Sequence, residues 1–146
     1  VYKEYWEDGT LEKTRTFKNG HKIKEIGYYG DRQKSREGNF KKVLDEGSRE
    51  WKDVETGLHT KWYKNGQKKS AVNYVDGKFD GQYTEWMENG EKSTNIIYKN
   101  GKKWDGVWVE FNDYAGQMTR KENYISSTII NNEIVFVTHD IHEWRF

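Results

Sequence analysis

The sequence of 146 residues contains no cysteine and no proline. The lack of cysteine excludes disulfide bonds and thiolate metal sites. Because proline is absent, no residue removes a backbone donor from the interior of a β-sheet. No apolar run approaches the roughly 18–20 residues that a membrane-spanning helix requires. These absences leave a fold that depends on non-covalent contacts between uninterrupted elements.

A surplus of charge of one sign is also missing. The chain has 25 lysine and arginine residues against 24 aspartate and glutamate residues, for a formal net charge of +1. A nucleic-acid groove needs a basic excess on one face, so no nucleic acid is expected as a partner. Membrane association through anionic lipids stays open but is not supported by this charge.

Aliphatic residues are scarce. Hydrophobic residues make up 33% of the chain and aromatic residues alone 16%, whereas charged residues make up 34%. Such a charge content would indicate disorder in a chain poor in aromatic residues. Here the aromatic residues recur in register, which predicts a thin folded structure that buries rings between neighbouring units. The length indicates a single domain.

A supersecondary unit repeats along the chain. Each unit has an aromatic residue, a turn glycine four positions later, a second aromatic residue after eight further positions, and then Asn-Gly or Asp-Gly. The two clearest units carry these anchors at Trp62, Gly66, Tyr74 and Gly77 and at Trp86, Gly90, Tyr98 and Gly101. Every anchor recurs after 24 positions. A repeat of this kind indicates an array of stacked units and favours binding over catalysis.

Three weaker units extend the pattern. Their anchors are Tyr5, Gly9 and Phe17, then Tyr28, Arg32 and Phe40, and finally Phe111, Gly116 and Tyr124. Because Arg32 replaces the turn glycine, a different turn is expected there. The excess segment Lys41–Gly57 is either an insertion or a degenerate unit. We assign residues 1–126 to the repeats, with an irregular insertion at 41–57, and residues 127–146 to a C-terminal capping hairpin and tail.

Turn residues and periodicity predict the fold class. Eight of the 14 glycines follow Asn or Asp, and such pairs favour the type I′ turns of tight hairpins. The segments between them alternate in polarity with a period of two. We therefore predict an all-β fold, an elongated, twisted, single-layered antiparallel meander of consecutive β-hairpins. Its repeat core is predicted at Trp62, Tyr74, Trp86, Tyr98, Phe111 and Tyr124.

The C-terminal segment leaves the repeat. Two aliphatic runs, Thr128–Ile130 and Ile134–Val137, flank Asn131–Glu133. They predict a last hairpin that packs on the final repeat as a cap. Its outer edge must be shielded to prevent aggregation.

The segments Gly57–Gly66 and Tyr74–Gly81 resemble MORN-type repeats, in the bacterial variant of the YwqK-like antitoxin family. The resemblance covers Gly57–Tyr124 and Tyr5–Gly20 well. It implies a hairpin array that serves protein–protein contact and, in some members, membrane association. Choline-binding cell-wall repeats are a second resemblance, but the Tyr-x-Asn/Asp-Gly-Lys half of the unit fits the MORN variant better. The compartment stays open between bacterial cytoplasm and, if a signal peptide has been removed, the cell envelope.

Signs of catalysis or of a bound cofactor are weak. No serine or cysteine lies in a nucleophile motif, and no glycine loop could cradle a phosphate. Glu85 and Glu110 lie at equivalent repeat positions, where Lys61 lies in the previous unit, and a cross-strand charge ladder explains all three. Glu88 adds a third carboxylate to this region. No catalytic residue and no cofactor are therefore predicted.

Histidines could only bind metal near the C-terminus. The cluster His139–Glu143 is the densest group of metal-ligand types, but in a strand His139 and His142 would point to opposite faces. His21 and His59 each stand alone in strand context and are expected to be surface or packed residues. No metal site is therefore predicted.

The remaining functional candidates are aromatic residues opposite the predicted core. Tyr63, Met87 and Trp108 are expected on the other, partly exposed face, where amphipathic side chains suit a protein interface. The sequence thus predicts a non-enzymatic protein-binding module, in its most specific form an antitoxin or immunity protein that masks a cognate toxin. The alternative is a cell-envelope protein that binds a glycan or lipid head group in aromatic clefts between hairpins. The oligomeric state stays open.

Overall fold

The computed structural model describes the backbone of residues 1–111, 118–124, 129–130, 133–134 and 140–143, and the side chains of residues 1–104. Every regular element in these ranges is a β-strand. The strands are β1 (Tyr2–Tyr5), β2 (Leu11–Lys18), β3 (His21–Tyr28), β4 (Lys34–Leu44), β5 (Trp51–Trp62), β6 (Lys68–Val75), β7 (Lys78–Trp86), β8 (Lys92–Lys99), β9 (Lys102–Phe111), β10 (Met118–Tyr124), β11 (Ile129–Ile130), β12 (Glu133–Ile134) and β13 (Asp140–Glu143).

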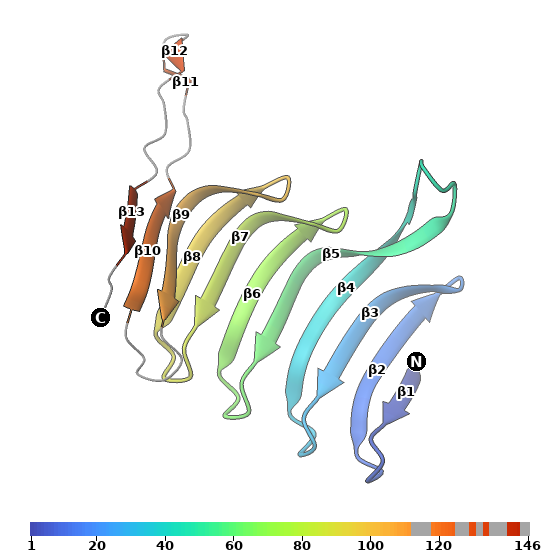
Figure 1. Cartoon of the computed structure of the whole chain (residues 1–146). Helices are drawn as coiled ribbons and strands as arrows, with labels where there is room; N and C mark the ends of the chain where they lie inside the picture. Colours follow the sequence, from blue (N-terminus) through green and yellow to red (C-terminus); the bar gives the residue numbers. More distant parts are fainter. Residues whose placement is uncertain (112–117, 125–128, 131–132, 135–139, 144–146) are drawn as a thin grey trace.

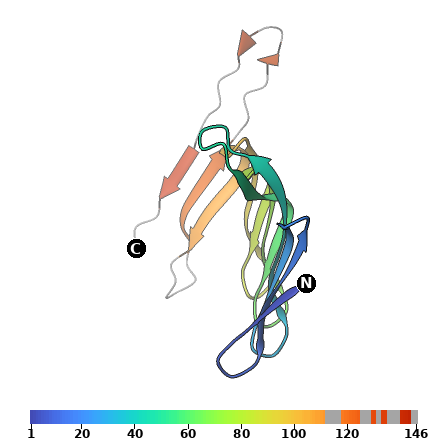
Figure 2. The same cartoon turned by 90° about the vertical axis from the view of Figure 1, so that its right-hand side faces the viewer.

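Within the described ranges, eleven strands form one antiparallel sheet in the order β1 to β10 and then β13. Figure 1 shows these strands side by side in chain order, with β1 and β13 at opposite ends of the row. Figure 2 shows that the sheet is a single, twisted layer. The predicted all-β meander of consecutive hairpins is therefore confirmed.

Type I′ turns close three of the hairpins at one end of the sheet. Two-residue loops join β2 to β3, β6 to β7 and β8 to β9. These loops are Asn19-Gly20, Asp76-Gly77 and Asn100-Gly101, and all six residues have φ between 50° and 80°. Positive φ at both central positions is the mark of a type I′ turn. The predicted turn type is confirmed at these three loops.

A second kind of turn, five residues long, closes the hairpins at the opposite end. The four examples among the described residues begin at Trp6, Tyr29, Tyr63 and Met87. In each, the amide of the first residue donates to the carbonyl of the fifth, and the amide of the fourth donates to the carbonyl of the first. The third residue is always Asp or Asn, and its side chain accepts a hydrogen bond from the amide of the fifth.

The prediction of a different turn at Arg32 is wrong. Arg32 has a φ of 69°, close to the 83° to 86° of Gly9, Gly66 and Gly90 in the other three turns. It also makes the same hydrogen bond to the first residue of its turn. The paired strands and the Asp31 side chain hold the backbone in this conformation, so a non-glycine residue adopts the left-handed region at a cost.

The segment 41–57 lies in the longest hairpin. β4 and β5 have 11 and 12 residues, and they pair as far as Leu44 opposite Trp51. Figure 1 shows this hairpin reaching beyond its neighbours at the end where the type I′ turns lie. The excess residues thus lengthen one hairpin and leave the strand order unchanged.

Buried side chains are few among residues 1–104. Val72, Ile96 and Tyr98 are the buried hydrophobic residues, and Thr60, Thr84 and Thr94 are the buried polar ones. Of the predicted core residues, Tyr98 is buried and Trp62, Tyr74 and Trp86 are half-buried. The side chains of Phe111 and Tyr124 lie outside the described residues.

At the C-terminal end, β13 pairs with β10 as the last strand of the sheet, with His142 opposite Lys121. β11 and β12 pair with each other and form a separate two-stranded sheet. The predicted hairpin around Asn131–Glu133 corresponds to this pair. The packing of its side chains, and His139 of the predicted histidine cluster, lie outside the described residues.

Candidate functional site: a groove on the ladder face

Six aromatic rings form a continuous row on one face of the sheet, which we call the ladder face. The rings are Phe40, His59, Tyr74, Phe79, Tyr83 and Tyr98. Neighbouring centroids lie 4.7 to 5.9 Å apart, mostly in edge-to-face arrangements. Such pairs contribute about 0.5–1.5 kcal/mol each beyond their buried area. The row therefore ties β4, β5, β6, β7 and β8 together on this face.

A glycine positions His59 in the row. A Cβ atom on Gly38 would lie 2.3 to 2.9 Å from the His59 ring, so only glycine leaves room for that ring against β4. The Nε2 atom of His59 lies 2.8 Å from the Asn39 carbonyl oxygen. The ring also contacts both Phe40 and Tyr74. His59 is thus a packed residue that continues the aromatic row toward β4.

The repeat anchors do not include His59, Phe79 and Tyr83, so these members of the row were not predicted. The signal was present, because Tyr83 follows His59 by the same 24 positions that separate the repeat anchors. His59 has an imidazole ring where Tyr83 has a phenol ring, so the two positions do not look equivalent in the sequence. Phe79 lies directly opposite Tyr74 in the strand register, at a position that the anchor pattern does not mark.

The tyrosines of the row remain protonated. Burial raises the pKa of Tyr74, Tyr83 and Tyr98 above the usual value. For Tyr83, a hydrogen bond from its hydroxyl to the Glu85 carboxylate raises the pKa further. These phenols therefore stay neutral hydrogen-bonding groups at physiological pH.

Two adjoining cavities make a groove across this face. One, of about 240 Å³, is lined by residues of β3 to β6, and the other, of about 200 Å³, by residues of β5, β6 and β7. His59, Lys61 and Tyr74 line both cavities. We call this continuous depression the ladder groove.

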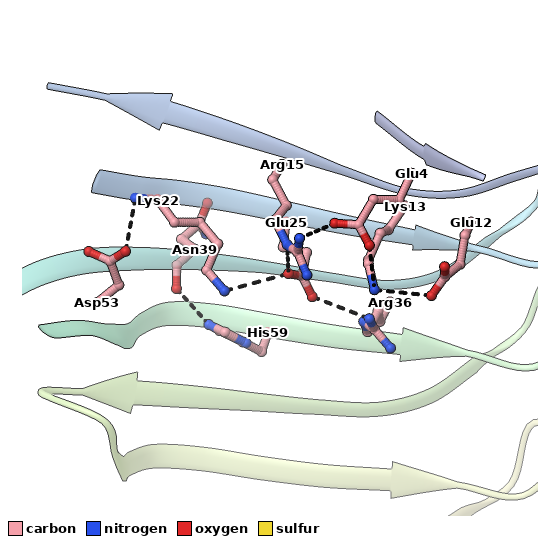
Figure 3. A network of polar contacts seen from close by, with 10 residues as sticks. All are labelled: Glu4, Glu12, Lys13, Arg15, Lys22, Glu25, Arg36, Asn39, Asp53 and His59. Carbon is pink, nitrogen blue, oxygen red and sulfur yellow. Dashed lines mark hydrogen bonds and ion pairs between the residues drawn. The ribbon is translucent and has the colours of Figure 1, made fainter. Parts of the chain in front are cut away.

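Charged residues occupy the same face at the N-terminal end of the sheet. Figure 3 shows them on neighbouring strands. The carboxylates are Glu4, Glu12 and Glu25, and the cations are Lys13, Arg15, Lys22 and Arg36. Arg15 bridges Glu4 in β1 and Glu25 in β3. We call the ladder face of β1–β4 the charged half and that of β5–β8 the aromatic half.

Glu25 is the centre of the charged half. Its carboxylate lies 2.9 Å from Arg15, 3.3 Å from Arg36 and 3.5 Å from Lys22. Burial alone would raise the pKa of Glu25, but the hydrogen bond from Arg15 and the charges of the three cations outweigh it. The pKa therefore lies below its usual value, and the network is stabilised while Glu25 is ionised.

The predicted charge ladder of Lys61 and Glu85 is wrong. In the strand register, Lys61 lies opposite Arg36 on one side and Ser70 on the other. Glu85 lies opposite Ser70 and Thr94, and its carboxylate accepts the Tyr83 hydroxyl. One strand thus separates the two predicted partners, and Lys61 faces a like charge instead.

The three predicted interface residues do not form one row. Tyr63 and Met87 begin equivalent turns at the ends of β5 and β7, and both are half-buried. Trp108 lies inside β9, where it pairs with Glu122 of β10, and its side chain lies outside the described residues.

Tyr63 has a structural partner. Its hydroxyl donates to the Trp86 carbonyl oxygen at 2.8 Å, and Tyr29 makes the same bond to the Trp62 carbonyl oxygen at 2.6 Å. We call these bonds tyrosine latches, because each joins one turn to the next repeat. The position therefore holds neighbouring repeats together in the two described examples.

The predicted core tryptophans also contact neighbouring repeats. The Lys34 ammonium lies 6.0 Å from the Trp62 ring centroid, and the Lys68 ammonium lies 6.0 Å from that of Trp86. These distances are at the outer limit of a cation–π contact, so each contributes little. Neither tryptophan takes part in the aromatic row found among residues 1–104.

Other kinds of site are not found in the described part of the chain. It contains no group of three or more histidine, aspartate or glutamate residues arranged to hold a metal ion. In the same residues, no helix has the length and apolar character to cross a bilayer.

A scan against protein-family models finds no match, and a search of curated proteins finds none either.

Proposed function

We propose that the chain is a non-enzymatic protein-binding module that binds its partner in the ladder groove. The observation that carries the proposal is the groove itself, which places half-buried rings beside charged side chains of both signs. Tyrosine and arginine are enriched at the energetic centres of protein interfaces because they combine apolar area with hydrogen-bonding groups. The groove contains Tyr74, Tyr83 and Arg36 in this setting.

The strands that form the groove are held together by backbone pairing. The groove lies across β3 to β7, whose neighbouring strands pair over most of their length. A preformed surface loses little conformational entropy on binding, which favours affinity. A sheet of this kind can cover an enzyme surface without any chemistry of its own.

In its most specific form, the proposal is that the partner is a toxin and the chain is its antitoxin or immunity protein. The support is the resemblance of Gly57–Gly66 and Tyr74–Gly81 to the repeats of the YwqK-like antitoxin family. The partner would then lose activity when the groove covers its active site. A toxin encoded beside this chain would add to the support.

A matched pair of variants tests the site of binding. Ser70→Trp places a bulky ring in the groove, since Ser70 lines the smaller cavity. Leu58→Trp places the same ring on the opposite face, because Leu58 alternates with His59 along β5 and is exposed. Both variants should fold, as judged by circular dichroism.

The measurement is affinity purification of tagged wild type and variants from the source cells, followed by mass spectrometry. We expect one stoichiometric protein that co-elutes with wild type and Leu58→Trp and is lost from Ser70→Trp. A partner that Ser70→Trp retains would contradict the groove as the site. A glycan or lipid in place of a protein would favour the envelope-ligand alternative.

A further inference from the structure

The strand register places two cations directly opposite each other at the boundary of the two halves. Arg36 in β4 lies opposite Lys61 in β5. Directly opposite side chains in an antiparallel pair have Cβ atoms about 5 Å apart, and like charges at this distance are destabilising. The fold therefore tolerates an unfavourable pair at this position.

Neighbouring carboxylates do not neutralise this pair. The contact of Arg36 with Glu25 is 3.3 Å long, and Glu25 already accepts a hydrogen bond from Arg15 and lies near Lys22. Among the side chains of residues 1–104, none forms an ion pair or hydrogen bond with the Lys61 ammonium. Positive charge is thus left over at the pair.

Both cations line the larger cavity of the ladder groove, together with Phe40, His59 and Tyr74. The cation pair therefore lies beside ring surfaces that offer apolar contact. A side chain that enters this cavity would meet positive charge on one wall and aromatic rings on another.

The other carboxylates that line the larger cavity are either paired with other cations or distant from Lys61. Glu37 is paired with Lys24 at 2.5 Å and Lys34 at 2.7 Å. Glu55 lies opposite Phe40 and Lys61 opposite Arg36, and these two β4 positions are four residues apart, which is about 13 Å in an extended strand. Neither carboxylate offsets the charge at Arg36 and Lys61.

We infer that Arg36 and Lys61 receive an aspartate or glutamate side chain of the protein partner, flanked by an apolar or aromatic residue that packs on the rings. This inference rests on the proposed function and specifies the chemistry of its partner. The carboxylate would relieve the repulsion between the two cations, so binding would gain from a feature that the free protein bears as a cost. Salt should weaken the contact, because both cations are exposed.

Charge reversal separates binding from folding. Lys61→Glu places a carboxylate opposite Arg36, so the melting temperature of this variant should rise by about 2 °C while acidic ligands lose their site. Lys61→Gln removes the charge without adding a new one. Lys92→Glu is the control, since Lys92 is exposed and lines neither cavity of the groove.

The probe is a displayed library of random 12-residue peptides, selected on the wild-type protein. Peptides that Ser70→Trp no longer binds are assigned to the groove. We expect these peptides to be rich in acidic and aromatic residues, to bind Lys92→Glu like wild type, and to bind Lys61→Glu at least tenfold more weakly, with Lys61→Gln in between.

Three outcomes would overturn the inference. Groove peptides without acidic residues that bind Lys61→Glu like wild type would refute it and leave the proposed function standing. No groove peptide at all would count against both. Anionic lipid vesicles that bind wild type but not Lys61→Glu, with no acidic peptide selected, would show that the cation pair serves a membrane surface.

Discussion

The charged and aromatic halves of the ladder face share one backbone and differ in their side chains. Equivalent positions in four strands lie six residues after the fourth residue of the preceding five-residue turn. These positions are occupied by Arg15 in β2, Gly38 in β4, Val72 in β6 and Ile96 in β8. Arg15 is half-buried and ion-paired, whereas Val72 is 8% exposed and Ile96 is fully buried. Equivalent positions of different hairpins thus accept either a salt-bridged cation or an aliphatic side chain. The lesson is that the turns and the strand register set this fold, while the facing residues decide what a surface can bind.

The two halves also differ in the physical source of their stability. Ion pairs in the charged half are partly exposed, and exposed pairs contribute about 0.2–1 kcal/mol each and weaken with salt. Rings and aliphatic side chains in the aromatic half gain from removal of apolar surface from water, at roughly 25 cal/mol per Å². Substitutions in the two halves should therefore differ in size and in their response to salt and pH.

The largest contrast is expected at equivalent positions of β8 and β2. Ile96→Ala should lower the free energy of unfolding by about 3 kcal/mol, because it removes a fully buried side chain and leaves a cavity. Arg15→Ala should cost about 1 kcal/mol and less in high salt. Urea unfolding at low and high salt measures both. Equal losses would remove the distinction between the halves.

The boundary between the halves gives the next effect. Gly38→Ala should cost about 2 kcal/mol, since the new methyl group would overlap the His59 ring and force that ring to move. Gly30→Ala is the control, because a Cβ atom there meets nothing within 4 Å. Thermal unfolding compares the two, and a Gly38 variant as stable as the Gly30 variant would show that the ring adapts without cost.

A smaller, pH-dependent effect is expected at the centre of the charged half. Glu25→Gln should cost about 1–2 kcal/mol at neutral pH, where it removes a carboxylate that lies near three cations. The folded pKa of Glu25 is lowered, so its contribution is present above the unfolded value of about 4.3 and is lost as the pH falls through the folded pKa. The difference between wild type and variant should therefore shrink below about pH 4. A difference that stays constant from pH 7 to pH 3 would contradict the role of ionised Glu25.

The smallest effect is expected at Arg32, which among the described five-residue turns is the one fourth residue that is not glycine. Arg32→Gly should raise the free energy of unfolding by about 0.5 kcal/mol, because glycine adopts a φ of 69° without steric cost but loses more entropy on folding. The turn then matches those at Gly9, Gly66 and Gly90. Precise denaturation midpoints measure this change, and a loss of stability would mean that the arginine side chain stabilises the turn.

Sequence patterns could predict the fold because its determinants are local. Six of the eight Asn-Gly and Asp-Gly pairs lie in turns, whereas Asp80-Gly81 and Asp105-Gly106 lie inside β7 and β9. The 24-residue step identifies consecutive hairpins. The turn at Arg32 was mispredicted since the surrounding hydrogen bonds impose the backbone conformation whatever the residue. In that case the strands override the local preference of one side chain.

The groove was harder to predict, because it depends on which residues lie opposite each other across strands. Bulges shift the register between Lys61 and Trp62 and again between Glu85 and Trp86. Counting along the chain therefore misassigns the neighbours of these residues. The pairing of Lys61 with Arg36 also depends on a shift in the register between β4 and β5, which no sequence spacing reveals.

The tyrosine latches have a consequence for cooperativity. Tyr29 and Tyr63 couple three successive hairpin units, whereas Trp6 and Met87, at the same turn position, have no phenolic hydroxyl. In an array with nearest-neighbour coupling, units joined by an extra contact open and close together. The stretch from β3 to β8 should thus exchange its amide hydrogens as one block. That block contains the whole ladder groove, so a partner bound there would reinforce the most tightly coupled part of the array.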